Sequence, residues 1–363
     1  MVSPAGDEAI MGDGVGQTLI LEDQSFLNQH SNMEVILFML AFLAYMVLYV
    51  VYQPKKDGEQ KENNPRRVRR TESRYRRTRI FDVLGLSFDQ CNSFRAFLDR
   101  FSSYEEVARA IKLAGITRSD MIIGVDFSAS NEWQGRKSYQ GRSCHNLHDV
   151  SSSKTFNPYQ RVLSIIGSTL EQFDSDHMIP VYGFGDKITQ DEAVFPFKET
   201  GQPCVGFIDV LEKYHRVART VQLGGPTSFE PIIRKAIEIV QEKQSYHLLL
   251  IITDGQIKDA ERTGEAIVKA SNHPISIIVI GVGDGPWDEM ENYDDNLPKR
   301  KFDNFQFVNF HQVCSKAKYA ETAFALHALM EVPDQYQSIC SLGYLTNATP
   351  PLTDNNDNTK KLK

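Results

Sequence analysis

The chain has 363 residues, of which 41% are hydrophobic and 24% are charged, and its net charge is −7. This composition is ordinary for a globular protein, and the negative charge argues against nucleic-acid binding as the main function. The five cysteines are widely separated, which excludes a zinc finger and a dense disulfide framework.

The first 79 residues are predicted to anchor the chain in a membrane. Residues 1–34 contain no lysine or arginine, and residues 35–52 form an uncharged apolar run. As an α-helix this run would be about 27 Å long, close to the hydrocarbon thickness of a bilayer. Residues 53–79 form a predicted flexible linker, and residues 55–79 carry eleven basic side chains against four acidic ones. By the positive-inside rule, we expect a single-pass protein with a cytoplasmic linker and domain and an extracytoplasmic N-terminus.

An α/β domain is predicted over residues 80–345, with its core at residues 119–332. Its apolar runs alternate with amphipathic segments, which is typical of a doubly wound, mostly parallel sheet covered by helices on both faces. A serine–glutamate capping pattern predicts a further helix that begins near residue 104. The polar residues 346–363 are expected to be a disordered tail. Strands are predicted at 121–127, 178–184, 247–253, 275–282 and 305–310, and helices at 158–173, 229–243, 260–271 and 315–332.

Five oxygen-bearing side chains lie just after predicted strands or just before a predicted helix. Asp126, Ser128 and Ser130 form a D-x-S-x-S pattern at the end of the first strand. Thr227 lies in a Gly-Gly-Pro turn, and Asp254 ends another strand. Ligands gather at the carboxyl ends of the strands in such sheets, and oxygen donors of this kind favour Mg²⁺ or Mn²⁺. The five residues predict a metal site with one coordination position open for an acidic side chain of a partner.

Residues 119–332 resemble a von Willebrand factor A domain of the copine type. The likeness is greatest to the plant ubiquitin ligases that join such a domain to a RING finger. It implies that the same five residues form a metal-ion-dependent adhesion site and that the domain binds proteins through a metal-bridged acidic group. The matching runs include Gly-Val-Asp-Phe-Ser-Ala-Ser-Asn-Glu-Trp (124–133), Gly-Pro-Thr-Ser-Phe (225–229), Thr-Asp-Gly-Gln (253–256) and Gly-Val-Gly-Asp-Gly-Pro-Trp-Asp (281–288).

The chain also departs from the pattern of both groups. Copines carry two C2 domains before the A domain, and residues 1–103 leave no room for even one complete C2 module. A RING finger needs Cys and His pairs at zinc spacing, whereas after residue 332 the chain has only Cys340 and no His. Calcium-triggered membrane docking and ubiquitin-ligase chemistry are therefore not predicted. Val2 excludes N-myristoylation.

Other groups of reactive side chains are interpreted as having no catalytic or binding role. The glycine-rich segment 281–285 is not followed by the Lys-Ser/Thr of a nucleotide loop. Cys144, His145 and His148 have no evident fourth ligand or base partner, so we expect a surface loop. The acidic residues 288–295 are expected to form a solvated face.

The preferred hypothesis is a membrane-anchored cytosolic protein-binding module that is not an enzyme. A first alternative is a substrate adaptor, without a RING of its own, in ubiquitin-ligase complexes. A second alternative is a scaffold that docks on anionic lipid through the basic residues 55–79.

Overall fold

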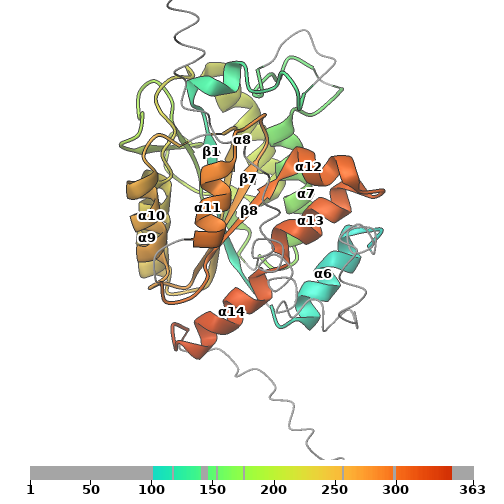
Figure 1. Ribbon diagram of the computed structural model, residues 1–363, viewed down its shortest axis with the longest axis vertical. Coiled ribbons are helices and arrows are strands. Elements are labelled where there is room, and N and C mark those ends of the chain that lie inside the picture. Colours follow the sequence, from blue (N-terminus) through green and yellow to red (C-terminus); the bar gives the residue numbers. More distant parts are fainter. Residues whose placement is uncertain are drawn as a thin grey trace, which may run out of the picture. The chain divides into compact units, whose positions relative to one another are not determined.

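The computed structural model describes residues 101–345, except for residues 117, 140–145, 153, 175, 256 and 297–299. The segments predicted at 1–34, 35–52, 53–79 and 346–363 lie outside the described residues. The described part is an α/β domain with a mostly parallel sheet between two layers of helices (Figure 1). The predicted α/β architecture is thereby confirmed.

The main sheet has six strands in the order β4-β3-β1-β6-β7-β8. Five of them run parallel, and only the edge strand β4 is antiparallel to its neighbour. A separate antiparallel pair is formed by β2 (Met178–Ile179) and β5 (Cys204–Val205). The strands of the main sheet are β1 (Asp120–Asp126), β3 (Val181–Phe184), β4 (Val194–Pro196), β6 (His247–Thr253), β7 (Ile275–Gly281) and β8 (Phe305–Asn309).

The three central strands are buried along their whole length. Successive side chains of a strand point to opposite faces, so each strand serves two hydrophobic cores. Val125 and Leu250 pack into one core, and Ile122 and Leu249 pack into the other. This two-sided burial explains why the strands read as continuous apolar runs in the sequence.

Helices cover both faces of the sheet (Figure 1). The helices of the larger core are α6 (Tyr104–Leu113), α7 (Pro158–Leu170), α8 (Gly206–Thr220), α12 (Phe310–Lys316), α13 (Ala320–Leu329) and α14 (Val332–Ser341). The helices of the other core are α9 (Glu230–Lys243), α10 (Ala260–Ala270) and α11 (Asp288–Asn296).

Two predicted elements are divided in the structure. The strand expected at 178–184 is interrupted at Pro180, where β2 leaves the main sheet to pair with β5 and β3 pairs with β1. The helix expected at 315–332 is replaced by the separate helices α12, α13 and α14. Pro333 lies in the first turn of α14, a position that suits proline because the first amides of a helix have no intrahelical partner.

The predicted membrane localisation is contradicted. In the part of the chain that the structure describes, no helix combines the length and the apolar character needed to cross a bilayer. The longest of the helices given above, α8, has 15 residues and would span about 22 Å, whereas about 20 residues are needed. The prediction of a single-pass protein was based on the apolar run at 35–52 together with its flanks, the lysine- and arginine-free residues 1–34 and the basic residues 55–79.

Candidate metal site

The candidate site lies at the carboxyl ends of the adjacent strands β1 and β6. The chain passes from β1 through α7 on one face of the sheet, and from β6 through α10 on the other face. Such a change of direction opens a crevice between two strands, because the loops that follow them diverge. Asp126 is the last residue of β1, and Asp254 directly follows β6.

Asp126 is completely buried, and its two carboxylate oxygens accept different hydrogen bonds. The backbone N–H of Ser128 donates to Oδ1 at 2.8 Å, and the hydroxyl of Thr253 donates to Oδ2 at 2.6 Å. Burial raises the pKa of the Asp126 carboxyl, and these two donors act in the opposite direction. Thr253 was not among the predicted site residues, although it orients the carboxylate from the neighbouring strand.

Ser128 and Ser130 are brought together in the loop after β1. Their hydroxyl oxygens are 3.0 Å apart, and this loop continues into a short 3₁₀ helix, η1 (Ala129–Glu132). The side-chain amide of Asn131 donates to the carbonyls of Asp126 and Ser128 at 3.3 Å and 3.2 Å. This local network holds the loop in a conformation in which the two serine hydroxyls lie together just after Asp126.

The loop that carries Thr227 is hydrogen-bonded to the loop after β1. The backbone of Gly224 accepts from Ala129 at 3.0 Å and donates to the carbonyl of Phe127 at 3.3 Å, which joins the two loops. The Thr227 side chain is buried, and among the described residues its hydroxyl makes no hydrogen bond with the other four predicted ligands. The structure therefore groups Asp126, Ser128, Ser130 and Asp254 and places Thr227 on an adjoining loop.

The surroundings of the Asp254 carboxylate are the strongest indication that this site binds a cation. It is fully buried, and among the described residues neither of its carboxylate oxygens has a hydrogen-bond partner. Burial raises its pKa well above the usual range, and the negative charge of Asp126 raises it further. Two buried carboxylates, one of them unpaired, are costly without a compensating positive charge. The donor set of Asp, Ser and Thr oxygens suits a hard divalent ion.

His148 is a residue that the sequence-based interpretation misplaced. It was expected on a surface loop, but its side chain is buried between the rings of Phe127 and Tyr159, at centroid distances of 4.4 Å and 4.1 Å. Its Nε2–H donates to the carbonyl of Asp126 at 2.7 Å, and Nδ1 accepts from the hydroxyl of Tyr214 at 2.8 Å. His148 thus supports the end of β1. Cys144 and His145 lie outside the described residues.

We expect His148 to make the fold sensitive to acid. Burial lowers its pKa to about 3 from 6.5. Its contribution to stability is therefore fully present above pH 6.5 and is lost as the pH falls toward the folded value, at about 1.4 kcal/mol per pH unit. Denaturant unfolding at several pH values should show a weaker acid-induced loss in His148→Gln than in the parent. The exposed His311→Gln is the control, and equal pH slopes in all three proteins would contradict the prediction.

Known proteins similar to this chain include copine proteins and plant ubiquitin ligases. The copine family model matches residues 146–348. The E3 ubiquitin-protein ligase RGLG1 of Arabidopsis thaliana is 47% identical over 263 residues, which are 68% of this chain and 53% of the ligase. Copine family protein 1 of Caenorhabditis elegans is 44% identical over 275 residues, which are 75% of this chain and 24% of the nematode protein. Among solved structures, the manganese-loaded TRAP protein of Plasmodium vivax has a TM-score of 0.36 and 13% identity, and the match covers 56% of this chain and 74% of that one.

Proposed function

This chain belongs to the copine family, and from that premise we propose that it is a protein-binding module whose metal site receives an acidic side chain of a protein partner. The metal is Mg²⁺, or Mn²⁺ in its place. The bound ion would supply a positive charge at the protein surface, to which a carboxylate of the partner can bind. The proposed ligands are Asp126, Ser128, Ser130, Thr227 and Asp254.

The observation that carries this proposal is the unpaired, buried carboxylate of Asp254 beside Asp126. Aspartates that only cap turns accept hydrogen bonds from nearby backbone amides, as Asp126 does from Ser128. Among the described residues, the oxygens of Asp254 accept no hydrogen bond of normal geometry, and the nearby Ser130 hydroxyl offsets its charge only in part. A divalent ion supplies that compensation and leaves a charge of the right sign for an acidic ligand.

Exposed apolar side chains around the site support a protein as the ligand. Trp133 is 44% exposed in the segment after β1, and Ile188 is 88% exposed in the loop after β3. This second loop is joined to the loop before Thr227, because the N–H of Lys187 donates to the carbonyl of Gln222 at 3.0 Å. Large apolar side chains next to a charged centre are characteristic of protein interfaces.

The proposal is tested by metal binding and by partner capture with one pair of variants. Titration with Mn²⁺, followed by electron paramagnetic resonance of the free ion, should show binding to the parent chain and loss of that binding, by about a hundredfold, in Asp126→Ala. Protein partners captured from cell extract should be released by a chelator from the parent and be absent from Asp126→Ala. Glu132→Ala removes an exposed carboxylate from the same loop and should behave as the parent. Equal capture by Asp126→Ala and the parent would overturn the proposal.

A second candidate function is suggested by the 47% identity with an E3 ubiquitin-protein ligase. In this role the chain would use the same site to bring substrates to ligase complexes without catalysing ubiquitin transfer itself. Proximity labelling in cells should then recover ubiquitin-conjugating or ligase proteins in an Asp126-dependent manner. Their absence would favour the simple binding module.

A further inference from the structure

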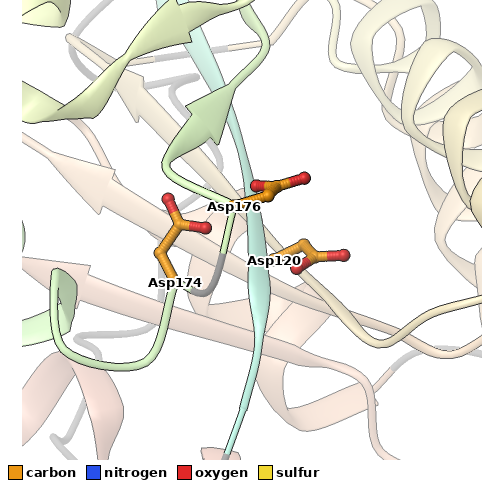
Figure 2. A group of neighbouring side chains, drawn as sticks. All are labelled: Asp120, Asp174 and Asp176. Atoms are coloured by element: carbon orange, nitrogen blue, oxygen red, sulfur yellow. The ribbon is translucent and has the colours of Figure 1, made fainter.

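Three carboxylates meet at the amino end of the main sheet, opposite the candidate metal site. Asp120 is the first residue of β1, and Asp174 and Asp176 lie in the segment between α7 and β2 (Figure 2). One carboxylate oxygen from each lies within 4.8 Å of the others. Because β1 rises about 3.3 Å per residue, this group is about 20 Å from Asp126. It is therefore separate from the site described above.

Two of these carboxylates are buried and incompletely satisfied. Asp120 and Asp174 are 4% and 5% exposed. Among the described residues, neither oxygen of Asp174 has a hydrogen-bond partner, and the same is true of Oδ1 of Asp120. The other oxygen of Asp120 accepts from the hydroxyl of Ser245 at 2.6 Å. An unpaired buried carboxylate is strongly unfavourable unless a cation or a proton compensates its charge.

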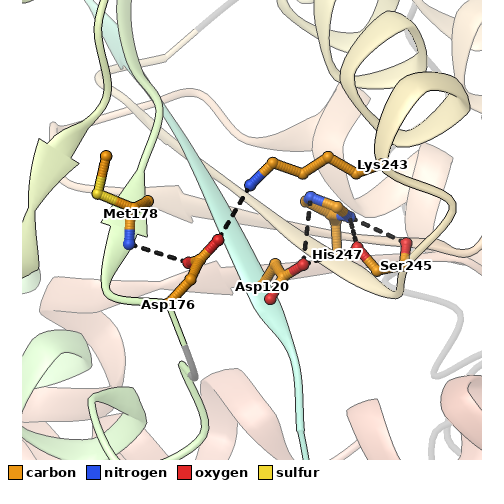
Figure 3. Close-up of polar contacts among 6 residues, drawn as sticks. All are labelled: Asp120, Asp176, Met178, Lys243, Ser245 and His247. Atoms are coloured by element: carbon orange, nitrogen blue, oxygen red, sulfur yellow. Dashed lines mark hydrogen bonds and ion pairs between the residues drawn. The ribbon is translucent and has the colours of Figure 1, made fainter.

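His247 is a buried residue next to these carboxylates. The ring nitrogen that faces them has no hydrogen-bond partner among the described residues. Nδ1 of His247 must donate its proton to the carbonyl of Ser245, at 2.9 Å, because that oxygen can only accept. In the neutral ring Nε2 is then an acceptor, and it has no hydrogen-bond partner among the described residues. This nitrogen is 3.8 Å from Oδ2 of Asp120 (Figure 3). Two acceptors face each other there, an unfavourable arrangement that a cation or a proton between them would relieve.

Lys243 provides a positive charge next to these carboxylates, and it pairs with Asp176, the most exposed of the three. Lys243 Nζ is 3.3 Å from Asp176, which also accepts the N–H of Met178 at 3.0 Å (Figure 3). Asp176 is 41% exposed, so its charge is the best solvated of the three. Burial, followed by the negative charge of Asp176, raises the pKa of Asp174 to about 6.

We propose that Asp120, Asp174 and Asp176 form a second cation site, and that Ca²⁺ is the ion it fits best. Carboxylate oxygens are hard ligands that favour Ca²⁺, Mg²⁺ and Mn²⁺. Oxygens within 4.8 Å of one another lie within about twice the Ca–O distance of 2.3–2.6 Å, and Ca²⁺ accepts irregular sets of oxygen ligands, whereas Mg²⁺ demands a near-ideal octahedron. The bound ion would fasten the segment before β2 to the start of β1.

The proposal is tested by calorimetric titration of the full chain with Ca²⁺, in the parent and in an Asp126→Ala background. Both should bind Ca²⁺ at this site, and both should be stabilised against heat. Asp174→Asn and Asp176→Asn should each weaken that binding by about tenfold or more, because a charged ligand is lost while the shape is kept. Glu171→Gln removes an exposed charge close by in the chain and should leave Ca²⁺ binding unchanged. Circular dichroism confirms that each variant is folded, and Asp176→Asn is the safer of the two because that side chain is exposed.

Three results would overturn this inference. Ca²⁺ binding that is unchanged in both Asp174→Asn and Asp176→Asn would exclude the site. Ca²⁺ binding that is lost in Asp126→Ala but kept in Asp174→Asn would assign the ion to the other end of the sheet. Stabilisation by acid together with no response to Ca²⁺ would show that a proton occupies the position between Asp174 and Asp176.

Discussion

Asp254→Asn is expected to stabilise the metal-free protein by about 2 kcal/mol and to abolish its stabilisation by Mg²⁺. The physical reason is that Asp254 is a buried carboxylate without a hydrogen-bond partner among the described residues, beside the second buried carboxylate of Asp126. The amide keeps the shape and removes the charge. Thermal unfolding with a chelator and with excess Mg²⁺ measures both effects, since an ion that binds only the folded state raises the melting temperature.

Asp284→Asn is the control for this prediction, and it is expected to lower the stability of the protein rather than to raise it. Both oxygens of Asp284 accept backbone N–H groups, from Lys137 at 2.9 Å and from Ser138 at 2.7 Å. Asp284→Asn replaces one acceptor by a donor and should destabilise the protein by about 1–2 kcal/mol, with the Mg²⁺ response retained. If Asp254→Asn is destabilising to the same extent, the unpaired-charge argument is wrong.

Gly283→Ala is expected to destabilise the fold by about 3 kcal/mol and to weaken Mg²⁺ binding, although Gly283 provides no ligand. A Cβ at this position would lie 2.3 Å from the backbone carbonyl oxygen of Asp254. A backbone atom can move away only if the whole loop shifts, and that shift displaces the Asp254 carboxylate. Denaturant unfolding and Mn²⁺ titration measure the two consequences.

Gly255→Ala is the matched control, because it adds the same methyl group one residue after Asp254. There the nearest atom would be the side-chain amide nitrogen of Gln134 at 3.4 Å, which is an ordinary contact. Its effect on stability should be within about 0.5 kcal/mol, with metal binding unchanged. A similar loss in both variants would indicate general intolerance of the loop rather than a specific contact with Asp254.

The predictable part of the site consists of residues that are close in sequence or that end a strand. Asp126, Ser128 and Ser130 lie within five residues, so the loop after β1 alone brings them together. Asp254 could be placed beside them because adjacent parallel strands end at the same edge. The partners of these residues could not be predicted, since Thr253 donates to a carboxylate 127 positions earlier.

His148 shows why apparent polarity in the sequence can mislead. Most of its neighbours in the chain are polar, and the apolar Leu147 and Val150 are too few to form a periodic pattern that indicates burial. The side chain is buried because the ring of Phe127, just after β1, and the ring of Tyr159, in α7, pack on its two sides, and because it donates to the carbonyl of Asp126. These contacts form because segments that are distant in the sequence pack together in the fold. Sequence periodicity does not predict which segments pack together.

The amino-acid sequence was enough to predict the α/β fold, the copine resemblance and metal ligands at the ends of β1 and β6, because apolar periodicity and short motifs are local properties. It also suggested a membrane protein, a prediction that the described helices contradict. The packing of the folded chain showed which buried carboxylate oxygens have no hydrogen-bond partner among the described residues: both oxygens of Asp254 at one end of the sheet, and both of Asp174 and Oδ1 of Asp120 at the other. Whether a buried carboxylate has a hydrogen-bond partner depends on every group that packs around it. These groups come from distant parts of the sequence and meet only in the folded chain.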